Sequence, residues 1–249
     1  MKRFQIFAVA IFLLILSSST AHALLKVEGR YWFSSLDSEI KYTEAGIMGT
    51  EIDLIDDLGM DDSENFQEGR ITLEMGNHKL RYGYTPLSWD GQKTIIEGIQ
   101  FGGVPYTAGT LVDSSLDIKY HRLGYEYDLL DVLDNKIGVI FEIKYFDIDA
   151  RLKATGIDES TTANAPIPTI GVTGQVAIPF LFSIGGELTG ITLGNRGYLF
   201  DGEAAFNFHP LPLITISGGY RILKMKVEEG DDKAIIDLKG PFLVLRAGF

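Results

Sequence analysis

One segment of the sequence carries serine, aspartate and histidine, the residue types of a nucleophilic hydrolase. Ser115, Asp117 and His121 share one parity, so they would lie on the same face of a β-strand. In such a hydrolase the histidine accepts the serine proton, which requires hydrogen-bond contact. At about 3.3 Å per residue, Ser115 and His121 would be about 20 Å apart along one strand. A base from another strand could still reach Ser115, but no G-x-S-x-G motif is present, and we expect no enzyme.

A second candidate is an acidic run whose carboxylates could bind a divalent cation through oxygen ligands. It contains Glu51, Asp53, Asp56, Asp57, Asp61, Asp62 and Glu64. The stretch Asp57-Leu58-Gly59-Met60-Asp61 breaks the spacing of the calcium loop D-x-[DN]-x-[DN]-G. We therefore favour a solvated acidic loop, with a cation site between Glu51 and Glu64 as the alternative. The sequence predicts no cofactor.

The N-terminus has the pattern of a secretory signal peptide. Met1-Lys2-Arg3 precedes an uncharged apolar run from Ile6 to Leu16, and Ala21-His22-Ala23 forms a small-x-small cleavage site. The apolar run is too short for a membrane helix, which needs about 20 residues. We expect a signal peptide over residues 1–23 and one domain over residues 24–249.

Charge and cysteine content exclude several classes of function. The net charge is −12, which disfavours nucleic-acid binding because phosphate-rich partners select basic surfaces. There is no cysteine, so disulfides, thiolate chemistry and a lipid anchor on an N-terminal cysteine are all excluded. The fold must be stabilised without covalent cross-links.

Several segments of about ten residues alternate apolar with polar or small residues, which predicts strands with two different faces. In the last segment Leu243, Leu245 and Ala247 share a parity, opposite the parity that carries Arg246. We expect ten strands, near 25–35, 66–76, 79–88, 113–128, 136–150, 168–178, 182–193, 197–208, 213–226 and 234–249. In the fourth, the apolar parity changes between Tyr120 and Leu123, which favours a β-bulge.

The expected connections alternate between long and short. The long ones are Leu36 to Asn65, Trp89 to Val112 and Arg151 to Ile167; tight turns lie at Asn77-His78 and around Pro179. With an even number of strands, both termini lie on one side and the longer loops on the other. Outer-membrane barrels have this asymmetry, with short periplasmic turns and longer external loops. Eight or twelve strands remain alternatives.

The C-terminal segment Gly240 to Phe249 resembles the last strand of bacterial outer-membrane β-barrels, with apolar residues at alternate positions and a terminal phenylalanine. The resemblance implies an all-β, antiparallel, up-and-down transmembrane barrel in the outer membrane of a Gram-negative bacterium, with both termini periplasmic and lipid around it. It also implies an insertion signal that the barrel-assembly machinery reads. The residues of this signal are Pro241, Leu243, Leu245, Ala247 and Phe249.

In such a barrel the opposite parity points inward and carries charges of both signs. We expect a lumen charge network of Glu28, Arg30, Glu68, Arg70, Glu74, Arg81, Glu142, Lys144, Glu187, Glu203, Arg221 and Arg246. A barrel of about eight strands is filled by its own side chains, whereas aqueous channels have about 16 to 18 strands. Ten strands therefore favour a mostly filled lumen.

The sequence is compatible with three functions. We favour a structural or surface-interaction barrel with acidic external loops. A narrow porin for small solutes is the first alternative, which conductance would distinguish. A lipid-modifying or proteolytic barrel is the second, and it requires a cluster of Ser, Asp or His residues at the outer rim.

Overall fold

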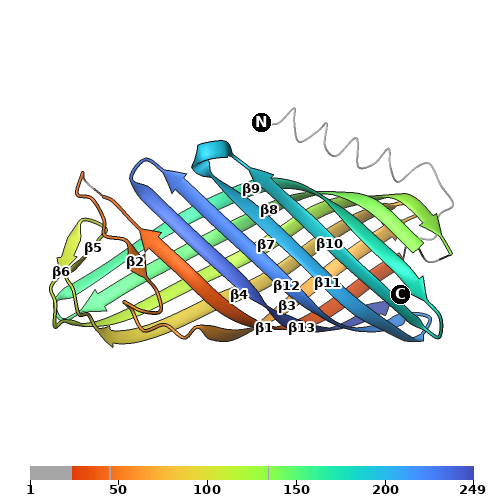
Figure 1. Ribbon diagram of the computed structural model, residues 1–249, viewed down its shortest axis with the longest axis horizontal. Coiled ribbons are helices and arrows are strands. Elements are labelled where there is room, and N and C mark those ends of the chain that lie inside the picture. The colour runs from red at the N-terminus through yellow and green to blue at the C-terminus, as the bar shows by residue number, and fades with distance from the viewer. Residues whose placement is uncertain (1–23, 45, 134) are drawn as a thin grey trace.

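The computed structural model describes residues 24–44, 46–133 and 135–249, and these form one closed barrel of ten long antiparallel strands (Figure 1). The strands are β1 (Leu24–Lys41), β3 (Ser63–Met75), β4 (His78–Thr94), β7 (Leu111–Val132), β8 (Asn135–Ala154), β9 (Ile157–Ile178), β10 (Phe182–Thr192), β11 (Gly197–Leu211), β12 (Ile214–Glu229) and β13 (Asp232–Gly248). Each pairs with the next, and β13 pairs with β1. The predicted ten-stranded up-and-down barrel is confirmed. The expected signal peptide, residues 1–23, lies outside the described residues.

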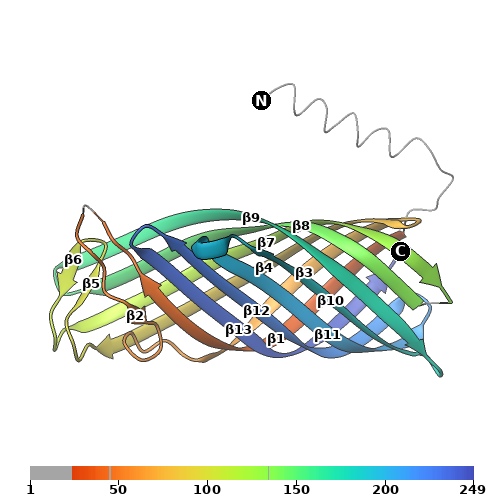
Figure 2. The same ribbon diagram turned by 45° about the horizontal axis from the view of Figure 1, so that its top comes forward.

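The two ends of the barrel differ in their connections. Leu25 and Phe249 exchange backbone hydrogen bonds of 3.1 and 2.7 Å, so the first strand begins where the last one ends. At this terminal end the strands are joined by turns of two or three residues. The opposite, loop end carries residues 42–62, with the short strand β2 (Ile52–Asp53), and residues 95–110, with the hairpin β5 (Ile99–Phe101) and β6 (Val104–Tyr106) (Figure 2). The predicted asymmetry is present in these two loops.

The prediction of a third long loop, over Arg151 to Ile167, is wrong. Strands β8 and β9 continue through this stretch and pair from Lys136 to Ala154, so only a tight turn at residues 155–156 joins them. The sequence of β9 between Ile157 and Pro166 has polar or small residues at most positions of both parities, which weakens the alternation that reveals a strand.

The apolar side of each strand changes from outside to inside part-way along the barrel. In β1, Val27 and Tyr31 face outward near the terminal end while Glu28 and Arg30 are buried in the lumen. Beyond Trp32, which is fully buried, inward positions include the buried Leu36, and outward positions become polar from Ser35 onward, as at Asp37. Apolar and polar residues still alternate, but the apolar parity points outward in the terminal half and inward in the loop half.

This reversal corrects the bulge expected between Tyr120 and Leu123. Even-numbered residues of β7 point inward without interruption from Val112 to Asp128, and the register shift lies between Asp128 and Leu130. Tyr120 is therefore an apolar residue of the interior and Leu123 one of the outer face. The change of apolar parity marks the border between two environments, not a defect in pairing.

The outer face of the terminal half carries a belt of exposed apolar side chains, the surface required of a barrel in lipid. The belt includes Val27, Ile71, Leu123, Ile137, Phe141, Ile143, Ile170, Val172, Ile184, Phe206, Ile216, Leu243 and Leu245. Strands such as β8 span 20 residues, whereas crossing a bilayer takes about 9 to 11. The loop half therefore projects beyond the belt. No helix in the described ranges is long and apolar enough to cross a membrane.

Candidate functional site: a doubly closed lumen

A compact group of buried charges fills the middle of the barrel. Arg221 is fully buried and donates to both oxygens of Asp201 at 2.9 Å and to Glu68 at 2.7 Å. Lys144 reaches Asp201 at 2.5 Å. Arg122 contacts the same Glu68 carboxylate. Each charge meets at least one opposite charge, which offsets the cost of its burial.

Several ion pairs join distant walls of the barrel. Arg70 of β3 and Glu187 of β10 stand five strands apart in the ring of ten, yet their side chains lie 3.5 Å apart. Arg81 of β4 donates to Glu187 at 2.5 Å. Arg30 of β1 forms a two-point contact with Glu203 of β11, at 2.5 and 2.8 Å. Side chains from opposite walls therefore meet within the lumen.

The structure places every residue of the expected lumen network in ion pairs within the barrel. The twelve residues are Glu28, Arg30, Glu68, Arg70, Glu74, Arg81, Glu142, Lys144, Glu187, Glu203, Arg221 and Arg246. Arg70 links the central part of this network because it approaches Glu28, Glu68, Glu187 and Glu203, whereas Glu74 pairs with Lys26 at 2.7 Å.

Sequence reasoning missed the contribution of β7 to this network. Arg122, Glu126 and Asp128 are buried there; Glu126 accepts from Lys79 at 2.6 Å and from Arg81 at 2.7 Å. Tyr120 donates to Asp201 at 3.1 Å. The supposed bulge hid them, although an unbroken even parity along β7 would have assigned all four to the interior.

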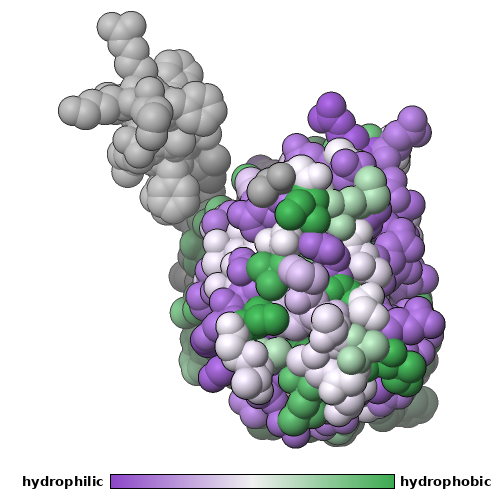
Figure 3. Space-filling model, turned by 90° about the vertical axis from the view of Figure 1, so that its left-hand side faces the viewer, coloured by the Kyte–Doolittle hydropathy of each residue, from purple (hydrophilic) through white to green (hydrophobic). Residues whose placement is uncertain are grey.

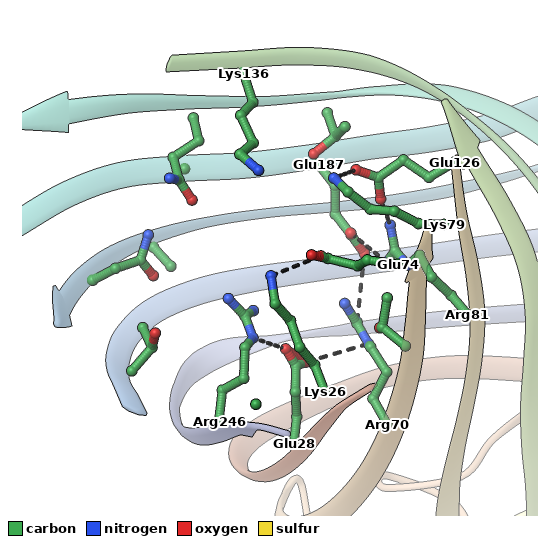
Figure 4. A pocket seen from close by; sticks show the side chains of 18 of the residues that line it. Lys26, Glu28, Arg70, Glu74, Lys79, Arg81, Glu126, Lys136, Glu187 and Arg246 are labelled. Carbon is green, nitrogen blue, oxygen red and sulfur yellow. Dashed lines mark hydrogen bonds and ion pairs between the residues drawn. The ribbon is translucent and has the colours of Figure 1, made fainter. Parts of the chain in front are cut away.

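A cavity of about 340 Å³ lies on the terminal side of the charged layer (Figure 4). In Figure 4, two ion pairs between neighbouring strands lie on its wall: Lys26 with Glu74, at 2.7 Å, and Arg246 with Glu28. Arg70, Arg81 and Glu187 belong to its lining. We call this cavity the vestibule; on its inner side stand the ion pairs that cross the barrel.

A second closure occupies the loop half, where the interior is an apolar core. Trp32, Trp89, Phe66, Leu116, Ile118, Leu223, Met225 and Leu238 are buried in it. The Phe66 and Trp89 rings meet edge to face, with centroids 5.1 Å apart. The Arg221 guanidinium lies 4.8 Å from the centre of the Trp32 ring. This contact joins the charged layer to the apolar core and leaves the two closures in series.

The two long loops extend this core over the mouth. Ile52, Leu54 and Leu58 from one loop and Ile95, Ile99 and Phe101 from the other are buried in the same cluster. The backbone of Thr50 donates to Gln100 at 3.0 Å, so the loops also bind each other. Figure 3 shows that both hydrophilic and hydrophobic residues lie on the surface of this end.

Tyr106 anchors the β5–β6 hairpin to the barrel wall. Its hydroxyl donates to the Leu152 carbonyl at 2.9 Å. Burial, with a smaller contribution from Glu159 and Asp158, raises the pKa of Tyr106 to about 12. The hydroxyl therefore remains a donor under all ordinary conditions.

The acidic loop uses part of its charge to shape itself. One oxygen of Asp53 accepts from the backbone of Ile55 at 2.8 Å and of Asp56 at 2.7 Å, and Asp57 accepts from the backbone of Asp53 at 2.9 Å. Among the described residues, no group of three or more His, Cys, Asp or Glu side chains is arranged to hold a metal ion. A cation between Glu51 and Glu64 stays a prediction.

Ser115, Asp117 and His121 do not form hydrogen bonds with one another. Asp117 accepts from Ser88 at 2.6 Å, and His121 shares a hydrogen bond of 2.9 Å with the Tyr82 hydroxyl. All three lie on outward positions of β7.

A different serine and histidine do meet, inside the terminal end of the barrel. Ser183 and His209 are hydrogen bonded at 3.0 Å, and His209 shares a hydrogen bond with Thr215 at 3.1 Å. Ser183 is 2% exposed and also accepts from Asn207. Each imidazole nitrogen thus contacts a hydroxyl group, and the buried pair fits a polar lining better than an accessible nucleophile.

The predicted insertion signal occupies one face of the last strand. Pro241, Leu243 and Leu245 are exposed on the outer face of β13, and Ala247 is half-buried on the same parity. Phe249 follows directly and is also exposed. These residues lie where β13 pairs with β1, at the closing seam. Their role in insertion stays a prediction.

No protein-family model and no curated protein matches this sequence. Among solved structures, the barrel is similar to the outer membrane protease OmpT of Escherichia coli, with a TM-score of 0.54, 10% identity and coverage of 92% of this chain and 98% of that one. The transport unit of the autotransporter AIDA-I of Escherichia coli is similar with a TM-score of 0.44, 8% identity and coverage of 93% of this chain and 90% of that one. Ail of Yersinia pestis is similar with a TM-score of 0.40, 9% identity and coverage of 92% of this chain and 99% of that one. The likeness to OmpT shows the fold, that of an outer-membrane β-barrel.

Proposed function

We propose that this outer-membrane β-barrel is a non-conducting protein that works through the surface of its loop end, outside the cell. The observation that carries the proposal is the double closure. The pair Arg70–Glu187 joins opposite walls, and the apolar core around Trp32 and Trp89 lies in series with it. A hydrated path would have to break ion pairs in one layer and wet an apolar interior in the next.

The connections support an orientation with the terminal end in the periplasm. All four turns at that end have two or three residues, while the loops 42–62 and 95–110 lie opposite. Barrels of the bacterial outer membrane have short turns inside and longer loops outside. The signal peptide expected from the sequence fits export to this membrane.

The loop end has the properties of a recognition surface. The two loops are held by buried side chains and by hydrogen bonds such as Gln100 to Thr50 at 3.0 Å. Lys233 ties Glu51 to the rim of the barrel, at 3.4 Å from Glu51 and 2.5 Å from Glu39. A surface ordered before binding loses less conformational entropy when a partner docks. Its many carboxylates favour a basic partner.

Site-directed labelling tests this orientation cleanly because the chain has no cysteine. Ile96→Cys places a thiol on an exposed tip at the loop end, and Asn77→Cys places one in the turn between β3 and β4. With a maleimide too large for porins, we expect Ile96→Cys to react on intact cells and Asn77→Cys only after the outer membrane is permeabilised. The reverse pattern would refute an outward loop end.

A further inference from the structure

Large apolar side chains are exposed on three neighbouring turns at the terminal end and on the strand ends that flank them. We call this set the apolar lip: Leu129, Leu130, Val132, Leu133, Phe180, Leu181, Leu211 and Leu213. Phe180 is 88% exposed and Leu133 is 85% exposed. Turns that stand in water are ordinarily built from polar residues, glycine and proline. An exposed apolar patch of this kind indicates a surface that contacts something.

The three turns adjoin one another around the rim. The backbone of Ala177 donates to the Asn135 side chain at 3.0 Å, which joins the β9–β10 side to the β7–β8 hairpin. The backbone of His209 donates to the Leu181 carbonyl at 2.8 Å, which joins β11 to the same turn. The lip is therefore one arc of the rim, running from β7 to β12.

Local turn chemistry does not account for the residues of the central turn. Phe180 and Leu181 have φ values of 68° and 72°, a region that glycine and asparagine occupy far more readily than large side chains. Either glycine or asparagine would fit this turn with less strain. The apolar side chains are thus retained against the backbone preference, which points to a contact that they make.

The lip adjoins the lipid-facing belt, although the Lys136–Asp131 ion pair lies within the β7–β8 hairpin. On the outer face, Ile137 of β8, Val176 of β9 and Ile184 of β10 are each more than half exposed and stand next to the turns. On β7 the outward tyrosines Tyr125 and Tyr127 precede Leu129, so the lip extends past these aromatics, which are typical of a membrane interface. The chemistry of the lip is that of the surface it continues.

We propose that the apolar lip lies in the boundary between headgroups and acyl chains of the periplasmic leaflet, anchoring that arc of the barrel more deeply than the β3–β4 side. The turn between β3 and β4, Gly76-Asn77, carries no large apolar side chain. The leaflet named here rests on the orientation proposed above. Contact with lipid does not, because it follows from continuity with the belt.

Tryptophan fluorescence tests the lip directly, since Trp32 and Trp89 are 0% and 1% exposed inside the barrel and give a background shielded from lipid. Phe180→Trp and Leu213→Trp place reporters on the lip. Ile96→Trp is the matched control, at an apolar position 82% exposed at the opposite end. The full exported barrel is reconstituted in phosphatidylcholine vesicles that carry bromine either near the headgroup or near the acyl terminus.

We expect both lip reporters to lose about half of their added emission with bromine near the headgroup and less with bromine near the acyl terminus, as for side chains at an interface. The Ile96→Trp emission should stay unquenched. Heat-modifiable gel mobility confirms that each variant is folded. Quenching of both lip reporters no greater than that of Ile96→Trp would overturn the proposal and leave a periplasmic protein as the occupant of the lip. Labelling of the loop end tests the orientation separately, so the proposed orientation and the proposed lipid contact of the lip can fail independently.

Discussion

Arg70 and Glu187 meet at 3.5 Å from opposite walls of the barrel, so two side chains are long enough to span the lumen between them. The closed lumen proposed above depends on this contact, because it places an ion pair between the two walls at the charged layer. The same Glu187 accepts from Arg81 and Arg122, which makes it the point where three cations converge.

Loss of that convergence should destabilise the barrel. Glu187→Ala leaves the guanidinium groups around it without a shared counter-charge, and breaking a buried ion pair costs about 3 to 5 kcal/mol. Unfolding by guanidinium chloride in detergent measures the change. Lys119→Ala is the control, because its pair with Asp147 lies on the exposed outer face. Equal stability of the two variants would contradict a structural role for the network.

The apolar core should hold the long loop in place. Leu58 belongs to the loop 42–62 and is 1% exposed, and replacing a buried leucine by alanine costs about 2 to 5 kcal/mol. We expect Leu58→Ala to make this loop sensitive to protease while the barrel itself stays folded. Ile47→Ala, at an exposed position of the same loop, should behave as the parent protein does. Resistance of the Leu58 variant would show that the loop is held by other contacts.

Tyr106 predicts a response to alkaline pH. Its pKa of about 12 in the folded protein exceeds the ordinary value of 10.0, so the fold favours the protonated phenol. The stabilisation is complete below pH 10 and is lost as the pH rises through about 12. The difference in ultraviolet absorbance between the parent and Tyr106→Phe should therefore titrate near pH 12. A midpoint near 10 would mean that the hairpin is not docked as described.

The terminal phenylalanine should affect insertion more than stability. Phe249 is exposed, so its side chain stabilises little once the barrel is folded. If it is part of the signal that the assembly machinery reads, Phe249→Ala should lower the yield of inserted barrel in cells without shifting its unfolding midpoint in detergent. Ile216→Ala, which is exposed on the outer face of β12, is the control. An unchanged yield would refute the signal.

Sequence reasoning predicted the strand number, the inward charges and the two long loops because alternation survives along most strands. It failed where alternation carried two meanings. Along β7 the apolar side changes from the interior at Tyr120 to the outer face at Leu123, and sequence alone presents this as a shift of register. It also failed in the first part of β9, where a strand outside the apolar belt has no need of an apolar outer face.

The apolar core of the loop half could not be foreseen for a related reason. Trp32 shares a parity with Arg30, so both side chains point into the lumen. A prediction that assumes a uniformly polar lumen does not expect the apolar Trp32 ring there. Contacts between segments far apart in the chain decide which loop residues are buried at the mouth. One example is the close approach of the Leu58 backbone to Gly91. Periodicity within one segment carries no information on such contacts.

The central claim is that the lumen is closed, and single-channel conductance in planar bilayers tests it most directly. Heat-modifiable mobility first establishes that the protein added to the bilayer is folded. The account predicts no steady conductance from inserted protein. Steady openings whose ion selectivity changes with Glu187→Gln or Arg221→Gln would show that ions pass through the charged layer, and would contradict it.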